Sequence, residues 1–431
     1  MTAENFSSDI AYAQRADARD PLARFRERFW IPEGMIYMDG NSLGLCPRDG
    51  ESSVLALLDQ WKTMGINGWL DAPVPWFYLP EHLGARVAPL VGAKPEEVVL
   101  SASTTTNLHT LVATFFRPDS RRYRILADEL NFPSDLYALR SQLRLAGRNP
   151  QSDLVLARSL DALTLDENEL IACMDDTVAL AVLPSVLYRS GQLLDMERLA
   201  RIGRERGVVV GFDCSHSVGS VPHHFDAWGV DFAFWCSYKH LNGGPGSPAF
   251  LYVNERHFDR EPGLAGWFGY AKERQFDLAV DFVPQRSAGG WQIGSPHLLS
   301  AAPLLGSLAI FAEAGIEAVR EKSLALTTYL MELVDATLTS APYHYQVATP
   351  RDPRRRGGHV AVEHPTEAWR ICQALKARRI VPDFRPDRIL RIAPVALYNS
   401  FEDVWHVAHA LREIVDRKEY EAFPRERGAV S

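Results

Sequence analysis

The sequence lacks the cysteine pattern of a disulfide-bonded or zinc-binding protein. It has only five cysteines in 431 residues, an odd number, and no CxxC pair. Disulfide frameworks and structural zinc sites need paired, closely spaced cysteines. We therefore expect reduced thiols, as in a cytoplasmic protein, and no metal site. The five are Cys46, Cys173, Cys214, Cys236 and Cys372.

Long hydrophobic runs and an excess of positive charge are also missing. No stretch reaches the ~18 apolar residues that a membrane-spanning helix needs. Residues 1–20 carry acidic side chains and no apolar core, which argues against a secretory signal. The formal net charge is −8, so neither a nucleic acid nor an anionic membrane surface is expected as the main partner. These absences favour a soluble, cytoplasmic protein.

The sequence has enough apolar residues for a large core. Hydrophobic residues make up 46% of the chain and aromatic residues 10%, and 431 residues are too many for one small domain. Strand-like apolar runs alternate with helical patterns over residues 95–255, which predicts an α/β fold with a mostly parallel, doubly wound sheet. The glycine motif of Rossmann folds is absent. The pattern changes after residue 334, where we expect a smaller α+β domain.

We predict three segments along the chain: residues 1–48, which pack with the small domain, a large domain of residues 49–310, and a small domain of residues 311–431. The predicted strands of the large domain are 98–101, 123–128, 153–157, 177–186, 208–212, 230–235 and 249–253. The predicted helices are 17–29, 50–62, 77–91, 162–174, 195–207, two within 298–334 on either side of Gly315, and 401–415. The tail from Arg417 is expected to fray. The arginine-rich loop 351–358 is interpreted as a solvated turn, although an anion-binding patch is the alternative.

The most informative residues are a lysine and an aspartate at the ends of two buried strands. Lys239 follows the apolar run 230–235, and Asp213 follows the apolar run 208–212. A lysine among apolar neighbours loses some preference for its charged form, and a neutral amine is what Schiff-base chemistry with an aldehyde cofactor needs. An aspartate at a parallel strand end can pair with a pyridinium nitrogen. The alternative is that both are ordinary strand-end charges.

Two further stretches fit a phosphorylated aromatic cofactor. The cluster SASTTTNLH follows a short strand and opens a helix, whose free N–H groups can bind phosphate through Thr104 and Thr105; an ordinary helix cap is the alternative. Phe132 precedes a Pro-Ser-Asp helix start and is placed to stack on a flat ring. Its alternative is a hydrophobic staple onto the next helix. Ser134 and Asp135 follow directly.

The segments GFDCSHSVG and AWGVDFAFWCSYKHLNGGPG closely resemble the cofactor segment of kynureninase, a pyridoxal phosphate (PLP) enzyme of the aspartate-aminotransferase fold type I. YMDGNSLGLCPR, TTTNLH, LNFPSDLYAL, GWFGY and RIAPVALYNSFEDV agree in the same order, so the resemblance covers residues 10–415. It implies PLP as cofactor, a homodimer with shared active sites, an amino-acid substrate, and a place in tryptophan catabolism. The reaction it implies is hydrolytic cleavage of L-kynurenine, or of a ring-substituted relative, to an anthranilate-type acid and L-alanine.

The resemblance also assigns roles to individual residues. Lys239 and Tyr238 are implied to be catalytic, Lys239 as the cofactor amine and general base. The implied cofactor-binding residues are Thr104, Thr105, Phe132, Ser134, Asp135, Asp213, His216, Tyr238, Lys239, Trp267 and Ser295, the last of these reaching the neighbouring subunit's phosphate. The implied substrate-binding residues are Arg391, Asn41, Trp69, Tyr270 and Gly294, with Arg391 on the α-carboxylate.

The residues alone leave simpler roles open for several of these positions. Arg391 could be a strand-end surface arginine, Trp69 a core aromatic residue, and His216 a polar core histidine. Tyr270 stands where the family commonly has histidine, which bears on the ring substituents accepted. Two other functions remain as alternatives: a PLP lyase of the cysteine-desulfurase type, which needs a mobile cysteine nucleophile, and a non-catalytic binding protein, which would be expected to lack Lys239, Asp213 or Arg391. A kynureninase relative with another aryl-ketone substrate is a third.

Overall fold

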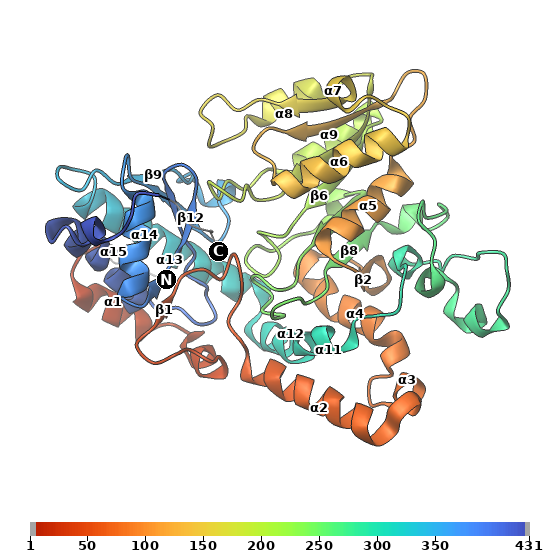
Figure 1. Cartoon of the computed structure of the whole chain (residues 1–431), viewed down its shortest axis with the longest axis horizontal. Helices are drawn as coiled ribbons and strands as arrows, with labels where there is room; N and C mark the ends of the chain where they lie inside the picture. The colour runs from red at the N-terminus through yellow and green to blue at the C-terminus, as the bar shows by residue number, and fades with distance from the viewer. Residues whose placement is uncertain (1–5, 427–431) are drawn as a thin grey trace.

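The computed structural model describes residues 6–426 and has two lobes of unequal size (Figure 1). The larger lobe is built around a seven-stranded sheet in the order β2-β8-β7-β6-β5-β3-β4. The strands are β2 (Val98–Leu100), β3 (Arg124–Asp128), β4 (Leu154–Ala157), β5 (Val178–Pro184), β6 (Val209–Asp213), β7 (Phe232–Trp235) and β8 (Phe250–Val253). All neighbours from β7 to β4 are parallel, and only β8 runs antiparallel to its two neighbours. The predicted α/β class with a mostly parallel sheet is confirmed.

Helices cover both faces of this sheet. On one face lie α5 (Thr104–Phe115), α6 (Pro133–Leu145) and α7 (Pro150–Asp153), and on the other lie α4 (Leu79–Val91), α8 (Glu167–Cys173), α9 (Met196–Arg206) and α12 (Pro303–Ala314). Alternate residues of one strand enter different cores, because successive side chains point to opposite faces. In β5, Leu180 and Val182 join the α5 side, whereas Ala181 and Leu183 join the α4 side. The strand is therefore apolar along its whole length.

The smaller lobe has its own core and an antiparallel sheet in the order β12-β13-β10-β9. Its strands are β9 (Gln346–Val347), β10 (Val360–Glu363), β12 (Asp383–Arg385) and β13 (Ile389–Ile392), and its helices are α13 (Ile316–Thr337), α14 (Ala368–Ala377) and α15 (Phe401–Asp416). Gly315 separates α12 from α13 with φ of +76°, as the sequence predicted for two helices around this glycine.

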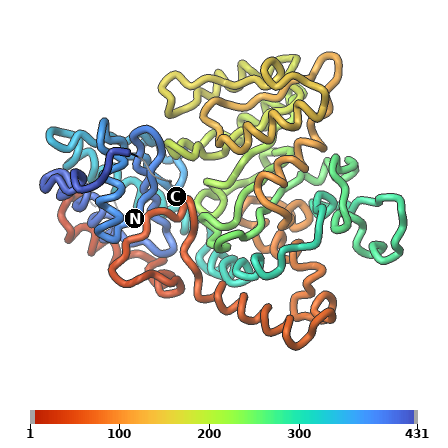
Figure 2. The backbone as a smooth tube through the Cα atoms, viewed as in Figure 1, coloured from red at the N-terminus to blue at the C-terminus, as the bar shows by residue number. Residues whose placement is uncertain are grey.

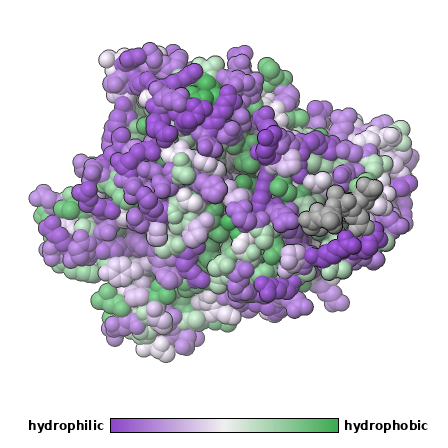
Figure 3. All heavy atoms as spheres, turned by 180° about the vertical axis from the view of Figure 1, so that it is seen from behind, coloured by the Kyte–Doolittle hydropathy of each residue, from purple (hydrophilic) through white to green (hydrophobic). Residues whose placement is uncertain are grey.

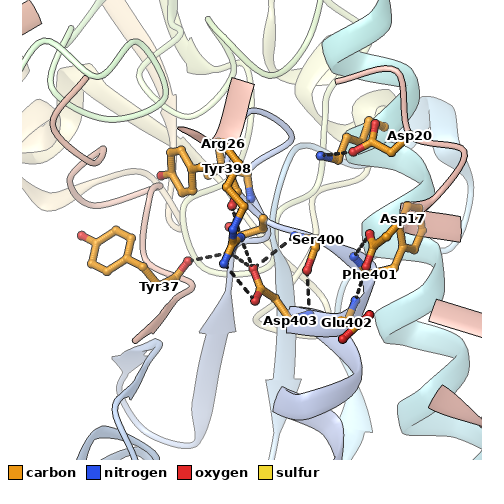
Figure 4. Close-up of polar contacts among 12 residues, drawn as sticks. Asp17, Asp20, Arg26, Tyr37, Tyr398, Ser400, Phe401, Glu402 and Asp403 are labelled. Atoms are coloured by element: carbon orange, nitrogen blue, oxygen red, sulfur yellow. Dashed lines mark hydrogen bonds and ion pairs between the residues drawn. The ribbon is translucent and has the colours of Figure 1, made fainter. Parts of the chain in front are cut away.

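The start of the chain lies against its end, so the red and blue segments in Figure 2 share the smaller lobe. Helix α1 (Ile10–Asp17) packs on α15, and β1 (Ile36–Tyr37) pairs in parallel with β11 (Ile380–Val381). Figure 4 shows the polar contacts that fasten this segment. The Asp17 carboxylate accepts hydrogen bonds from the first N–H groups of α15, those of Phe401 and Glu402, at 2.7 and 2.9 Å.

After this N-terminal segment, α2 (Arg48–Met64) runs along the lower edge of the molecule toward the larger lobe (Figure 1). Three short helices, α3 (Gly68–Asp71), α10 (Phe225–Trp228) and α11 (Leu298–Ala301), complete the set. The face of the molecule in Figure 3 is mostly hydrophilic, with hydrophobic side chains gathered in smaller groups. Within residues 6–426 no single helix is both long and apolar enough to cross a membrane; α11–α12 and α13 meet that test only as a pair bent by 81°.

Two predicted helices are wrong in their extent. Residues 17–29 do not form one helix: α1 ends at Asp17, and a 3-10 turn follows at Ala23–Arg28. Pro21 explains the break, because proline disfavours helical backbone at the residue before it. The predicted helix 162–174 begins only at Glu167, since the Asp161 carboxylate accepts bonds from Leu163 and Thr164 N–H and holds a turn there.

Two other expectations are also corrected. The tail from Arg417 does not fray over its described part: a 3-10 turn forms at Glu419–Ala422, and Glu419 pairs with Arg378 at 2.6 Å. Residues 427–431 lie outside the described chain. In the loop 351–358, Arg356 is not solvated but 2% exposed, and it donates to the hydroxyl of Thr328 on α13. The other three arginines of this loop, Arg351, Arg354 and Arg355, are exposed, as the interpretation of a solvated turn predicts.

Candidate active site at the strand ends of the large sheet

A cavity opens where β5, β6 and β7 end, the edge at which open α/β sheets bind ligands. All of the predicted cofactor-binding residues except Trp267 and Ser295 line it. The lining residues are Thr104, Thr105, Leu130, Asn131, Phe132, Ser134, Asp135, Pro184, Val186, Tyr188, Asp213, Ser215, His216, Tyr238 and Lys239. Segments from residue 104 to residue 239 therefore meet in one place, as the parallel strand order requires.

Lys239 lies at the floor of this cavity with a histidine beside it. Its Nζ is 2.9 Å from Nε2 of His216, which comes from the turn after β6. Burial and the nearby positive charges of Lys239 and Arg391 hold the pKa of His216 well below its ordinary value. The imidazole is therefore neutral, and its Nε2 accepts a hydrogen bond from the lysine. Nδ1 of His216 is buried and has no partner among the described residues.

Three carboxyl groups lie near one another, two of them lining the cavity and one, Asp128, beside it. Asp213 ends β6, Asp135 lies in the first turn of α6, and Asp128 ends β3. Burial and the neighbouring Asp213 carboxyl raise the pKa of Asp135 well above its ordinary value, and burial raises the pKa of Asp128 to about 7. Like charges this close cannot all ionise cheaply, so Asp135 retains a proton. Oδ2 of Asp135 has no partner among residues 6–426.

The remaining wall is made by two helix N-termini. Helices α5 and α6 both start at the cavity, and the hydroxyls of Thr105 and Ser134, one from each, lie 2.9 Å apart. Ser103 takes the ordinary capping role by accepting from Thr106 N–H, so neither Thr104 nor Thr105 is needed as the cap. Aligned N–H groups and hydroxyls at helix starts are suited to a phosphate. The residue that caps this helix in the ordinary way is therefore Ser103.

Phe132 stands at the rim of the cavity. It is 46% exposed and meets Tyr188 edge to face at 5.4 Å, so it is not a staple buried under α6. Pro133 at the first helical position fixes its direction. A rigid, half-exposed ring over a cavity with a carboxyl pair on one wall and a hydroxyl-lined helix end on another fits a phosphorylated pyridine.

The other predicted residues lie outside this cavity. Trp267 is 43% exposed, and Gly294 and Ser295 are also exposed. Trp69 packs near Phe268 at 6.0 Å, and Tyr270 is buried with its hydroxyl unpartnered among the described residues. The structure thus groups these five positions with the aromatic cluster around Phe268 and with the exposed loops near it.

Arg391 and Asn41 lie on the small-lobe side. Arg391 is 1% exposed and not a surface arginine, which removes the simpler alternative. Its guanidinium is held by Asp383, by the backbone oxygen of Tyr188 and by the hydroxyl of Ser42. Asn41 is fully buried, and neither polar atom of its side chain has a partner among the described residues.

Sequence reasoning missed several lining residues. Tyr188 and Val186 belong to the segment LPSVLYRSGQ after β5, whose position at a strand end was the available signal. Ser215 lies between Asp213 and His216, and its hydroxyl accepts from Cys236 N–H at 3.3 Å. Asp128, which closes β3 near Asp135 without lining the cavity, was also missed, because nothing local distinguishes it from an ordinary strand-end acid.

Comparisons with known proteins identify the family of this chain. Residues 319–411 match the family profile described as the kynureninase C-terminal domain. The chain is 55% identical over 420 residues to a kynureninase of Shouchella clausii, with 97% of both chains covered. The chain belongs to the kynureninase family. A kynureninase of Geobacillus thermodenitrificans, 51% identical over 431 residues and covered completely, supports the same family assignment.

Solved structures show that the kynureninase-family chain has the fold of PLP enzymes. A cysteine desulfurase of Thermococcus onnurineus superposes with a TM-score of 0.77 over 93% of this chain and 99% of that one, at 19% identity. A C-DES mutant with glycine covalently linked to its PLP cofactor superposes with a TM-score of 0.77 over 90% of this chain and 98% of that one, at 17% identity. At such identity the likeness concerns the fold.

Proposed function

We propose that this protein is a kynureninase that hydrolyses L-kynurenine, or a ring-substituted relative such as 3-hydroxykynurenine, to an anthranilate-type acid and L-alanine, with PLP as cofactor. The single observation that carries the proposal is the cavity where Lys239, Asp213 and the N-termini of α5 and α6 converge. Full-length identity above 50% to two proteins named kynureninase supports the substrate. Tryptophan catabolism is the pathway in which this reaction would serve.

The residues present fit PLP. When bound, it supplies an aldehyde that condenses with amines and a ring that takes up an electron pair. Lys239 would hold the aldehyde carbon, Asp213 would pair with the ring nitrogen, Phe132 would cover the ring, and Thr104, Thr105 and Ser134 would bind the phosphate. Asp135, which retains its own proton, can donate to Asp213 and so leave one negative charge facing the ring nitrogen.

Lys239, once freed by the incoming amino acid, is the group that can remove the α-proton. Neutral His216 supports that role, because it accepts a hydrogen bond from the amine and places no positive charge beside it. Tyr238 is adjacent, and the neighbouring Cys236 and burial raise its pKa, so its hydroxyl keeps its proton at neutral pH. It can donate to the phosphate and deliver a proton to the departing group.

The substrate's two ends would be held by different lobes. Arg391, from β13, is assigned to bind the α-carboxylate, since a guanidinium binds a carboxylate through two parallel N–H groups. Asn41, also assigned to the substrate, precedes Ser42, whose hydroxyl contacts Arg391. The aryl end would face Trp69, Tyr270 and Gly294. Tyr270 replaces the histidine common in the family, and we propose that this trio favours the ring without a hydroxyl group.

A homodimer would complete the site. Trp267 and Ser295, both assigned to the phosphate, are exposed and lie outside the cavity of their own chain. A second copy is therefore needed to bring such residues to a cofactor. An apolar groove lined by Leu57, Trp61, Leu298 and Leu299 offers a surface for that contact.

The other expectations are proposed on chemical grounds. All five cysteines are free, which suits the reducing cytoplasm. A cysteine-desulfurase activity is the second candidate because of the shared fold, but none of the described residues that line the cavity is a cysteine. Burial raises the pKa of Cys214 and Cys236, so neither offers a reactive thiolate. The expected partner is the small amino-acid substrate, with no nucleic acid and no membrane.

The test is product release from purified protein supplied with PLP. We expect L-alanine and an aromatic acid in equal amounts from L-kynurenine, more slowly from 3-hydroxy-L-kynurenine, and neither from the Lys239→Ala variant. Sulfide from L-cysteine would instead favour the desulfurase. If neither kynurenine is cleaved while the cofactor binds, the substrate assignment is wrong and other aryl ketones should be tried.

A further inference from the structure

Arg391 is fully engaged by the protein itself. Its Nε donates to Oδ2 of Asp383 at 2.7 Å, and Nη2 donates to the same oxygen. Nη1 donates to the backbone oxygen of Tyr188 at 2.7 Å, and Nη2 also meets Oγ of Ser42 at 3.0 Å. An arriving carboxylate must therefore displace the contacts with Tyr188 and Ser42, because the Asp383 pair lies on the other edge of the guanidinium.

Ser42 connects Arg391 to a second buried acid, Asp39. The side chains of Ser42 and Asp39 are hydrogen-bonded, and the tight turn between them is closed by Ser42 N–H donating to Asp39 O at 2.9 Å. Asp39 is 4% exposed, and its Oδ1 has no partner among the described residues. A hydroxyl that leaves Arg391 thus still has an acceptor in Asp39, so its displacement leaves no unpaired buried donor.

The charged groups around this turn lie on β12 and β13, and the titratable groups that face it in neutral form include the thiol of Cys372 on α14 and the phenol of Tyr398. Strand β12 contributes Asp383 and Arg385, whose side chains are paired at 3.0 Å, β13 contributes Arg391, and β1 contributes the neutral phenol of Tyr37. With Asp39 ionised, two carboxylates balance two guanidinium groups. The α-carboxylate of a bound amino acid adds a third negative charge to this buried cluster around Arg391. Balance returns if one carboxyl takes up a proton. Asp383 has two ion pairs to lose, whereas Asp39 has none with the residues that the structure describes.

We propose that Asp39 is a proton-linked positioning residue for the substrate: it takes up one proton from solvent when the α-carboxylate replaces Ser42 on Arg391. The proposal rests on the proposed function in one respect, the assignment of the α-carboxylate to Arg391. It adds a residue that touches neither substrate nor cofactor and acts through Ser42 and the charge at Arg391.

The raised pKa of Asp39 is consistent with proton uptake by this residue. Burial and the charge of Asp383 raise its pKa to about 6, against the opposing effects of Ser42, Arg391 and Arg385. At neutral pH the free site is mostly ionised, and a further carboxylate nearby raises the pKa again. By linkage, the affinity for the carboxylate falls as the pH rises through the pKa of Asp39, because binding then requires an extra proton.

The experiment measures the inhibition constant of L-alanine, an amino acid that cannot be cleaved, from about pH 5.5 to about pH 8.5. Wild-type holoenzyme is compared with Asp39→Asn, which keeps the shape and cannot ionise. We expect the ratio of the wild-type to the variant constant to rise about fivefold across this range, a coupling of ordinary size. Glu332→Gln is the matched control, since Glu332 is another small-lobe acid whose pKa is raised by burial, and its ratio should stay flat.

Two further measurements keep the outcomes distinct. Calorimetric titration of wild-type holoenzyme with L-alanine in two buffers of different ionisation enthalpy should show net proton uptake near pH 7, reduced in Asp39→Asn. Arg391→Lys should weaken the binding of L-alanine at every pH. A flat ratio for Asp39→Asn together with weakened binding in Arg391→Lys overturns the role of Asp39 alone. Unchanged binding in Arg391→Lys overturns the assignment of the carboxylate itself, and with it this proposal.

Discussion

The chemistry that we propose rests on single residues at the strand ends, and burial is the largest influence on the protonation of His216 and Asp135. Lys239 faces a neutral imidazole rather than a second cation, and Asp213 faces carboxyl groups of which at least one keeps its proton. Both arrangements are costly for a folded chain, because buried polar groups without full partners destabilise it. Such a loss of stability is expected in a binding site, where a ligand supplies the missing hydrogen-bond partners.

Asp128 allows this cost to be measured. Its folded pKa of about 7 lies above the value of an unfolded aspartate, so its contribution to stability is fully present below about pH 4 and is lost as the pH rises through 7. We expect Asp128→Asn to raise the melting temperature only slightly near pH 5, where most of the contribution remains, and clearly near pH 8, where the gain is at most about 4 kcal/mol. Thermal melts at the two pH values decide; an equal change at both would contradict the burial of an ionisable Asp128.

At the scale of elements, the spacing of strands and helices is what brings distant residues together. Glycine at position 211 is one requirement, because an added methyl group in β6 would lie about 2 Å from the ring of Phe232 on β7. The pairing of β6 with β7 fixes the position of Asp213, at the end of β6, relative to Lys239, which follows β7. A disturbance of this contact therefore reaches the cavity.

Gly211→Ala should lower the free energy of unfolding by about 1–3 kcal/mol through overpacking and weaken PLP retention. Gly294→Ala is the control for stability, since nothing lies within 4 Å of its added methyl group. Denaturant unfolding and the cofactor absorbance after dialysis measure the two effects. A Gly211→Ala protein as stable as wild type would show that the β6–β7 contact can relax.

The Asp17 contact with α15 gives a second test at this scale (Figure 4). The carboxylate accepts from two N–H groups that would otherwise lack a partner at the helix start. Asp17→Ala should cost about 1 kcal/mol of stability, and Asp17→Asn less, because an amide oxygen still accepts. Thermal melts of the two variants check the order; equal losses would mean that the hydrogen bonds contribute little.

The sequence predicted every strand of the large sheet and most of its helices, because buried parallel strands are continuous apolar runs that stand out from amphipathic helices. It failed where a single side chain overrides the local pattern, as Asp161 does in shortening α8 and Arg356 does in tying its loop to α13. The cavity lining was predictable where a residue closes a strand or opens a helix. Tyr188 and the Asp39–Ser42–Arg391 chain depend on contacts between segments hundreds of residues apart, which no local pattern contains. Asp128 closes a strand, but its burial beside Asp135 is a property of the packed fold.

At the scale of the whole molecule, we propose that a second copy of the chain completes the active site. Apolar side chains on α2, on α11 and in the turn between α2 and α3 are exposed, among them Trp61 at 57% and Ile66 at 77%. Surfaces of this kind are typical of protein interfaces. The dimer that we propose would bury them and bring Trp267 and Ser295 to the neighbouring cavity.

Trp61→Glu should convert the protein toward monomers and reduce PLP retention in parallel, because a charge placed in an apolar interface costs several kcal/mol. Leu145→Glu, on α6, is the control, as Leu145 is 79% exposed and away from this surface. Light scattering gives the mass and absorbance gives the bound cofactor. Dimers that persist in Trp61→Glu, or monomers that keep their PLP, would contradict the shared site.

The most direct test of the account is to find which amine holds the cofactor. PLP-loaded protein is reduced with borohydride, digested, and analysed by mass spectrometry. We predict one modified peptide, carrying the reduced cofactor on Lys239, with no modification in Lys239→Ala. Modification of another lysine, or none despite bound PLP, would contradict the assignment of the cavity and of the chemistry built on it.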